Sequence, residues 1–99
     1  MNQKNKKQKK EWIRNVYLQI GQNVKRYRTE KGFSQVTLAH ALGHDSVGVI
    51  STAELCLNGK HFNIEHLTKI ACVLEIDICC LFEGVNELAD AQKKASTDC

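Results

Sequence analysis

Residues 28–54, RTEKGFSQVTLAHALGHDSVGVISTAE, contain the start and stop signals of two short helices joined by a tight turn. Ser34 stands at the head of an apolar-periodic run, where a serine hydroxyl can accept a backbone N–H that the first turn of a helix leaves unbonded. Gly43 follows the last apolar position of that run, and helices commonly end on such a residue with positive φ. A second helix can therefore begin at Asp45 or Ser46.

The apolar residues of both segments are spaced for burial. The first helix has four apolar residues on or near one face: Val36, Leu38, Ala39 and Leu42. The second helix is expected to turn Ile50 and Ala53 inward. Two such helices, a glycine turn and a basic flank have the organisation of a helix-turn-helix, whose second helix enters the major groove of DNA.

The length and composition of the chain indicate one small domain without a membrane span. With 99 residues the chain is long enough for one hydrophobic core but not for two. No run approaches the roughly 18 apolar residues of a transmembrane helix, and no apolar signal-peptide segment follows the lysine-rich N-terminus. The five cysteines are an odd number without repeated spacing, which is a poor disulfide framework. We therefore expect a cytoplasmic protein without a membrane partner.

Positive charge is concentrated in the N-terminal third of the chain. Residues 1–35 hold ten lysines and arginines against two glutamates, a net charge of +8, whereas residues 36–99 hold four against nine acids, a net charge of −5. A polyanion is therefore expected to approach the N-terminal part first. Residues 1–10, MNQKNKKQKK, include five lysines and are expected to form a disordered basic arm. Such an arm either follows nucleic-acid phosphates or is only a solvated tail.

Between this arm and a short tail over residues 85–99, residues 11–84 have the pattern of an all-helical domain. A first helix is expected from about Glu11 to Lys31, with Gly21 as a possible break. Trp12 and Tyr17 on it either close the core or take part in a dimer contact.

The downstream helices are expected to begin at polar caps. Asn63 is expected to cap a helix whose inward positions are Ile64, Leu67, Ile70, Ala71 and Leu74. Asp77 is expected to cap a short fifth helix, which Gly84 ends.

Beyond these patterns the chain holds a longer ordered series of residues: Ile20, Gly21, Val24, Arg28, Gly32, Phe33, Ser34, Gln35, Leu38, Ala39, Leu42, Gly43, Ile50, Ser51, Glu54, Asn63, Ile64, Glu65, His66, Leu67, Ile70, Ala71, Leu74, Leu81 and Phe82. In order and spacing this series resembles the Cro/C1-type (XRE-like) helix-turn-helix family over about residues 20–83. The resemblance implies a five-helix, lambda-repressor-like domain that binds double-stranded DNA as a homodimer and regulates transcription, usually as a repressor. It also implies an ion pair between Arg28 and Glu54.

The resemblance assigns DNA-contacting roles to particular positions. Phosphate contacts are implied for Gln35, Ser46, Lys60 and His61, and base-facing positions for Val47, Gly48, Ser51 and Thr52. None of the base-facing four is an arginine, lysine, asparagine or glutamine, the residues that read bases through two hydrogen bonds. The sequence has one more residue between Gly43 and Ile50 than the family pattern. Either this residue brings His44 and Asp45 into a readout that depends partly on DNA shape, or the module binds a protein partner instead.

Catalytic and metal sites are not expected. The chain has no GxSxG, Walker-type loop, HExxH or paired-carboxylate arrangement, so we expect neither an enzyme nor a cofactor. A metal site would draw on Cys56, His61, Cys79 and Cys80, but the last two are adjacent and a helix directs them about 100° apart. The hypothesis of a DNA-binding regulator therefore competes with that of an antitoxin-like or accessory protein-interaction module.

Overall fold

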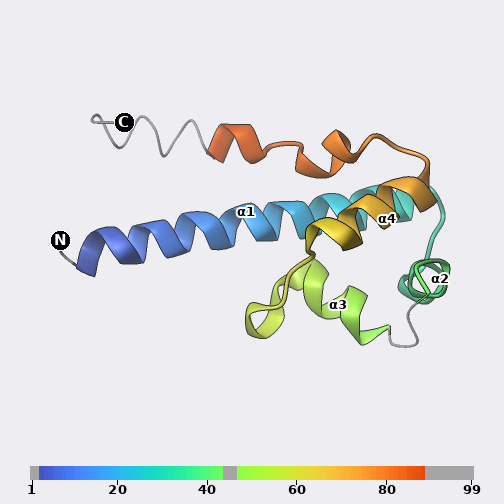
Figure 1. The fold of residues 1–99 in the computed structure, drawn as a ribbon, viewed down its shortest axis with the longest axis horizontal. Coiled ribbons are helices and arrows are strands. Elements are labelled where there is room, and N and C mark those ends of the chain that lie inside the picture. Colours follow the sequence, from blue (N-terminus) through green and yellow to red (C-terminus); the bar gives the residue numbers. More distant parts are fainter. Residues whose placement is uncertain (1–2, 44–46, 89–99) are drawn as a thin grey trace.

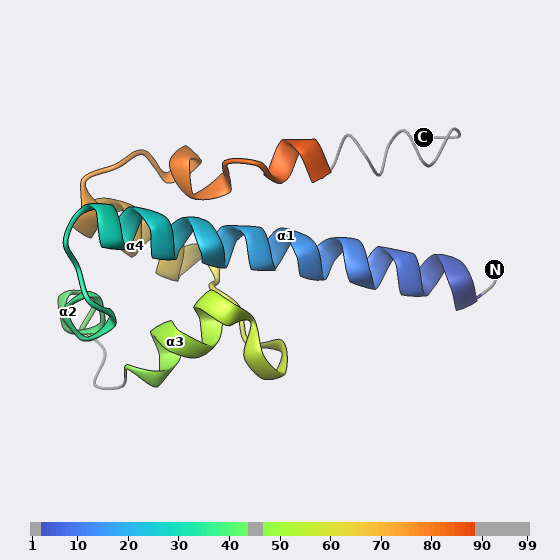
Figure 2. The ribbon, with the colours of Figure 1, turned by 180° about the vertical axis from the view of Figure 1, so that it is seen from behind.

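In the described part of the chain every regular element is a helix, no strand is present, and the helices are arranged along one long helix (Figures 1 and 2). The computed structural model describes residues 3–43 and 47–88, with side chains from Glu11 onward. Its elements are α1 (Gln3–Glu30), α2 (Gln35–Ala41), α3 (Gly48–Leu55), the 3-10 turn η1 (Leu57–Gly59), α4 (Ile64–Leu74) and the 3-10 helix η2 (Ile78–Phe82), followed by helical residues 85–88. Within these ranges no helix combines the length and the apolar character that a bilayer crossing requires.

The first helix begins earlier than expected. α1 starts at Gln3 instead of near Glu11, so residues 3–10 of the expected disordered arm continue the helix. Lysine and glutamine are good helix formers, and adding a residue to an existing helix costs far less than starting one. The basic segment is therefore the first two turns of α1, which extend beyond α2, α3 and α4 in both views (Figures 1 and 2).

Gly21 does not break α1; it marks the closest approach between α1 and α3. The residue is buried, and a Cβ atom built on it would lie 2.5 Å from the carbonyl oxygen of Glu54 and 3.0 Å from that of Ala53. Both atoms belong to the backbone of α3 and cannot move aside as a flexible side chain could. Glycine is thus required here by the packing of two helices.

The core lies between α1 and the helices packed on it. Its buried members are Ile20, Val24, Leu38, Ala39, Leu42, Ile50, Ala53, Phe62, Leu67, Ile70, Ala71, Leu74 and Leu81. Two residues that the periodicity placed on or near buried faces are exposed, Val36 by 48% and Ile64 by 66%. Successive residues of a helix are about 100° apart, and Val36 lies further than that from the centre of the buried face of α2. Ile64 is the first residue of α4 and lies at the edge of the buried face of that helix.

Three of the predicted helix caps are confirmed and one differs. Ser34 Oγ accepts the N–H of Thr37, Gly43 has φ 81°, and the Asn63 side chain accepts the N–H of His66. His66 Nδ1 in turn accepts the N–H of Asn63, which completes a capping box. Asp77 occupies the N-cap position of η2, but its side chain makes no capping hydrogen bond.

A buried asparagine, which the sequence patterns did not single out, ties η2 to α1. Asn23 is 2% exposed, and its Nδ2 donates to the carbonyl oxygens of Leu81 at 3.0 Å and Glu83 at 2.8 Å. Its Oδ1 accepts from Gln19 Nε2 at 3.0 Å. Because unbonded buried amides are costly, the two bonds to Leu81 and Glu83 specify where the C-terminal segment lies along α1.

We expect Gly21→Ala to lower the free energy of unfolding by about 1–3 kcal/mol, since the added methyl group would force α1 and α3 apart. Alanine in place of an unconstrained helical glycine has the opposite effect, a gain of up to about 1 kcal/mol. Urea denaturation measures the change, with the neighbouring exposed position as control in Gln22→Ala. Increased stability of Gly21→Ala would contradict the close approach.

Candidate nucleic-acid interface

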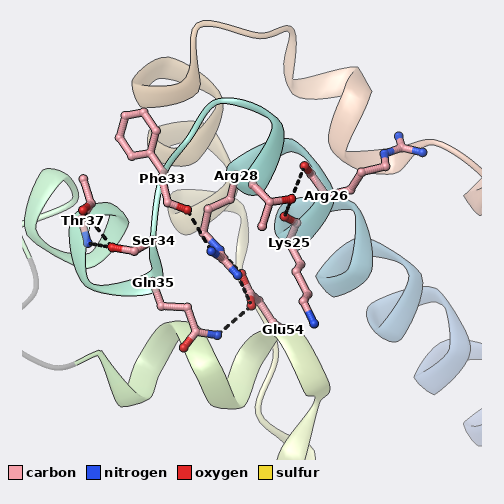
Figure 3. A network of polar contacts seen from close by, with 9 residues as sticks. Lys25, Arg26, Arg28, Phe33, Ser34, Gln35, Thr37 and Glu54 are labelled. Carbon is pink, nitrogen blue, oxygen red and sulfur yellow. Dashed lines mark hydrogen bonds and ion pairs between the residues drawn. The ribbon is translucent and has the colours of Figure 1, made fainter.

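A buried ion pair fixes α3 to the end of α1. Arg28 Nε donates to Glu54 Oε2 at 2.7 Å and Arg28 Nη2 to Glu54 Oε1 at 3.2 Å, so the structure brings the expected pair together (Figure 3). The side chains are only 7% and 1% exposed. Arg28 Nη1 also donates to the carbonyl oxygen of Phe33 at 2.9 Å, which holds the loop that leads into α2.

Gln35 completes this network from the first turn of α2. Its Nε2 donates to Glu54 Oε1 at 2.9 Å, and the side chain points toward α3 in Figure 3. The Glu54 carboxylate therefore accepts three hydrogen bonds, two from α1 and one from α2. The Gln35 amide nitrogen has two protons, so the phosphate contact that the resemblance implied would have to use the one not donated to Glu54. Gln35 thus holds α2 and α3 in a fixed relation.

The outward stripe of α3 is uncharged and, apart from Leu55, made of small residues. Gly48, Ser51, Thr52 and Leu55 follow one another at the spacing of a single helical face, while Ile50, Ala53 and Glu54 on the other side are buried. Gly48 and Leu55 are exposed, and Ser51 and Thr52 are half-buried. Three of the four expected base-facing positions therefore share the outward stripe.

The hydroxyl groups on this stripe are bonded to their own helix. Thr52 Oγ1 donates to the Gly48 carbonyl oxygen at 2.6 Å, and Ser51 Oγ donates to the same oxygen at 3.2 Å. A hydroxyl has one proton and two acceptor lone pairs. Both side chains therefore offer an acceptor outward while their proton is engaged in the helix.

The start of α3 differs from the expectation. The helix begins at Gly48, with Val47 as an N-cap residue whose side chain makes no capping bond. Val47 is half-buried and packs against the core, so its side chain is not fully available to a base. The expected phosphate contact Ser46, together with His44 and Asp45, lies outside the described residues.

The loop after α3 presents one exposed cation and a stacked histidine. Lys60 is exposed and follows η1. His61 stacks on Tyr17 of α1, with ring centroids 3.7 Å apart and planes inclined by 13°. His61 Nδ1 lies 3.3 Å from the carbonyl oxygen of Phe62. The stack, which no sequence pattern indicated, joins the expected phosphate-contact loop to α1.

A second ionic cluster joins α1 to the segment after η2. Arg26 forms an ion pair with Glu83, and the Tyr27 hydroxyl donates to the other oxygen of the same carboxylate. The guanidinium of Arg26 lies 4.8 Å from the Tyr27 ring centroid. The hydrogen bond to Glu83 raises the pKa of Tyr27 to about 12. Hydrogen bonds from Tyr27 and Arg26 in turn lower the pKa of Glu83.

The described residues offer no arrangement for metal binding. Across residues 3–43 and 47–88, no group of three or more His, Cys, Asp or Glu side chains could hold an ion. Cys56, Cys72, Cys79 and Cys80 are free thiols, and only Cys56 is buried. Burial raises the pKa of the Cys56 thiol, with Arg14 acting in the opposite direction.

Comparison with protein-family models, with curated proteins and with solved structures finds no match to this chain.

Removal of one partner of the buried pair leaves the other charge uncompensated. We expect Glu54→Ala to cost about 3–5 kcal/mol of unfolding free energy, measured by urea denaturation. The matched control is Glu65→Ala, which removes an exposed ion pair one helical turn long, with 3.7 Å between Glu65 Oε1 and Lys69 Nζ. This substitution should lower the unfolding free energy by less than about 1 kcal/mol. Equal losses in the two variants would show that burial does not strengthen the Arg28–Glu54 pair.

The raised pKa of Tyr27 makes its contribution to stability sensitive to alkali. The protonated phenol is favoured in the folded state, so its contribution is complete below the unfolded pKa of about 10. It is lost as the pH rises through the folded value of about 12. The difference in phenolate absorbance between the protein and Tyr27→Phe gives the titration of this residue, and Glu83→Ala should shift its midpoint toward 10. An unchanged midpoint would exclude Glu83 as the cause.

Proposed function

We propose that this protein is a DNA-binding transcriptional regulator of the Cro/C1-like helix-turn-helix type, acting in the cytoplasm as a homodimer and most simply as a repressor. The observation that carries the proposal is the network in which Glu54 receives Arg28 from α1 and Gln35 from α2 (Figure 3). This network holds α2 and α3 together as one rigid unit. A recognition helix needs such support if it is to enter a DNA groove in a defined orientation.

Phosphate contacts would supply most of the affinity. Residues 1–35 carry a net charge of +8, and most of them belong to α1, where Arg26 and Arg28 are paired with Glu83 and Glu54. Lys60 is exposed on the loop after α3. Each phosphate that such cations neutralise releases counterions, so affinity should fall steeply with salt concentration.

Selectivity would come from shape and from a few hydrogen-bond acceptors. Gly48, Ser51 and Thr52 on the outward stripe of α3 are small and uncharged, which allows close approach to a groove wall. Since the protons of Ser51 and Thr52 are engaged with the Gly48 carbonyl oxygen, each hydroxyl is suited to accept from a base amino group. Without bidentate side chains here, discrimination between sequences would rest largely on DNA shape.

A homodimer would place two such helices on two-fold-related half-sites about one turn of DNA apart. A protein bound there would exclude polymerase by occupying the same DNA, which is the simplest route to repression. The proposal requires no cofactor and no catalytic residue.

A second function, docking of a protein partner by the same module, is supported by a specific observation. Leu55 on the outward stripe of α3 is 54% exposed, and the nearby Leu57 is 48% exposed. Exposed leucines in place of base-reading side chains suit an apolar partner surface better than a DNA groove. The basic charge of α1 favours DNA instead.

Introduction of a negative charge on the outward stripe of α3 tests DNA binding. Thr52→Glu should weaken binding to DNA from upstream of the protein's own gene at least tenfold, about 1.4 kcal/mol, because the carboxylate would enter a groove bordered by negatively charged phosphates. Fluorescence anisotropy across a salt series measures the affinity. The control is Thr68→Glu on α4, since Thr68 Oγ1 bonds the carbonyl four residues before it at 2.8 Å, as Thr52 does at 2.6 Å.

The outcomes separate the two functions. Specific binding that survives competitor DNA and is lost only in Thr52→Glu supports the regulator. Binding that disappears near about 200 mM salt and is equal in both variants is phosphate attraction alone. Absence of any binding, with both variants folded by circular dichroism, would overturn the proposal in favour of a protein partner.

A further inference from the structure

A groove between α1 and the loop after α3 has the features of a ligand site. It encloses about 430 Å³, within the range of about 300–1,000 Å³ that small-molecule sites occupy. Ile13, Arg14 and Tyr17 line it from α1, and Cys56, Gly59, Lys60 and His61 line it from the end of α3 and the following loop. None of the sequence motifs or expected site residues required a cavity at this place.

The walls of the groove are mainly apolar, and contacts between side chains hold them in place. Ile13 lines the groove and is 44% exposed, a large amount for an isoleucine. The stack of Tyr17 and His61, with centroids 3.7 Å apart, forms a rigid aromatic side. The Cys56 thiol is buried and uncharged, since burial raises its pKa. Such a surface favours a hydrocarbon or aromatic group over water.

The charge around the groove has one sign. Arg14 and Lys60 are cationic, and no aspartate or glutamate is among the lining residues. Arg14 lines the groove from α1 and Lys60 lines it from the loop after η1, so the two cations belong to different elements. A ligand complementary to this arrangement has an apolar body and a single anionic end.

We propose that this groove binds a small amphipathic carboxylate, with its hydrocarbon part against Ile13 and Tyr17 and its carboxylate between Arg14 and Lys60. The carboxylate would receive charge-assisted hydrogen bonds from both cations. The apolar part would cover the exposed surface of Ile13 and gain the hydrophobic contribution that this residue lacks in the free protein.

The same groove gives the ligand a regulatory role if the proposed function holds. Lys60 and His61 line the groove and are also the loop residues proposed to meet DNA phosphates. A carboxylate that engages Lys60 competes with phosphate for the same cation, so ligand and DNA should each weaken the binding of the other by an equal factor. This consequence rests on the proposed DNA binding, whereas the binding of the ligand itself does not.

The test measures ligand binding on the full chain without DNA. Sodium decanoate is titrated into the ¹⁵N-labelled protein, and chemical-shift changes are followed at Gly59, Lys60 and His61. Decanol, which lacks the charge, and acetate, which lacks the apolar part, should each bind at least tenfold more weakly than decanoate. Binding of decanol as tight as that of decanoate, or of acetate as tight as that of decanoate, would overturn the proposed two-part recognition.

Two pairs of variants locate the site. Ile13→Gln and Arg14→Gln should each weaken decanoate binding at least about fivefold, whereas Ile64→Gln and Lys69→Gln, matched exposed residues on α4, should leave it within twofold. Equal effects in all four variants would show that decanoate binds elsewhere. If decanoate does not bind and sedimentation shows that Ile13→Gln converts a dimer to a monomer, the groove receives a second copy of the chain and the proposal fails.

Anisotropy with labelled DNA then separates the two proposals. Decanoate binding without any DNA binding would remove the proposed regulator and keep the ligand site. DNA binding without decanoate binding would remove the ligand site and keep the regulator. Decanoate that binds at the groove and lowers DNA affinity supports both.

Discussion

The arrangement of α1, α2 and α3 depends on one carboxylate. Glu54 is 2% exposed, and burial of a lone charge in such surroundings would be prohibitive. It is tolerated because Arg28 approaches with two nitrogens and Gln35 with a third, so that three segments separated in sequence meet at one side chain (Figure 3). Any rotation of α3 about its axis would remove these bonds and leave charge buried. The hydrogen bonds that the buried Glu54 carboxylate must make therefore determine which face of α3 points outward.

This constraint also explains why α1 and α3 lie so close together. The backbone of Glu54 contacts α1 at Gly21, and its side chain reaches Arg28 two turns further along the same helix. Two separate points on one helix thus locate α3, one through steric exclusion and one through hydrogen bonds. Contact at a single point would allow α3 to pivot on α1. The two contacts together fix the orientation of the outward face of α3.

Much of this organisation could be predicted from sequence, and the parts that could not share a physical cause. Caps such as Ser34 and Asn63 act within one turn of chain, and Gly43 marks its turn by its own conformational freedom, so local residues suffice to predict them. The bonds of Asn23 to η2 and the stacking of Tyr17 on His61 join segments about 40–60 residues apart, which no periodicity reveals. The groove between α1 and the loop after α3 is lined by the stacked Tyr17 and His61, so the sequence patterns do not predict the groove either. The sequence patterns do not predict the helical start of α1, because the lysine-rich segment has no apolar periodicity of its own and is helical as the extension of a neighbouring helix.

The bonds between Asn23 and the carbonyl oxygens of Leu81 and Glu83 have a further consequence for how the chain acquires its structure. The chain is synthesised from its N-terminus, so the amide of Asn23 lacks both acceptors until Leu81 and Glu83 have been added. The two bonds join residues 58 and 60 positions apart, and their formation closes a long loop at a cost in conformational entropy. The contact that positions the C-terminal segment along α1 can therefore form only after translation has passed Glu83.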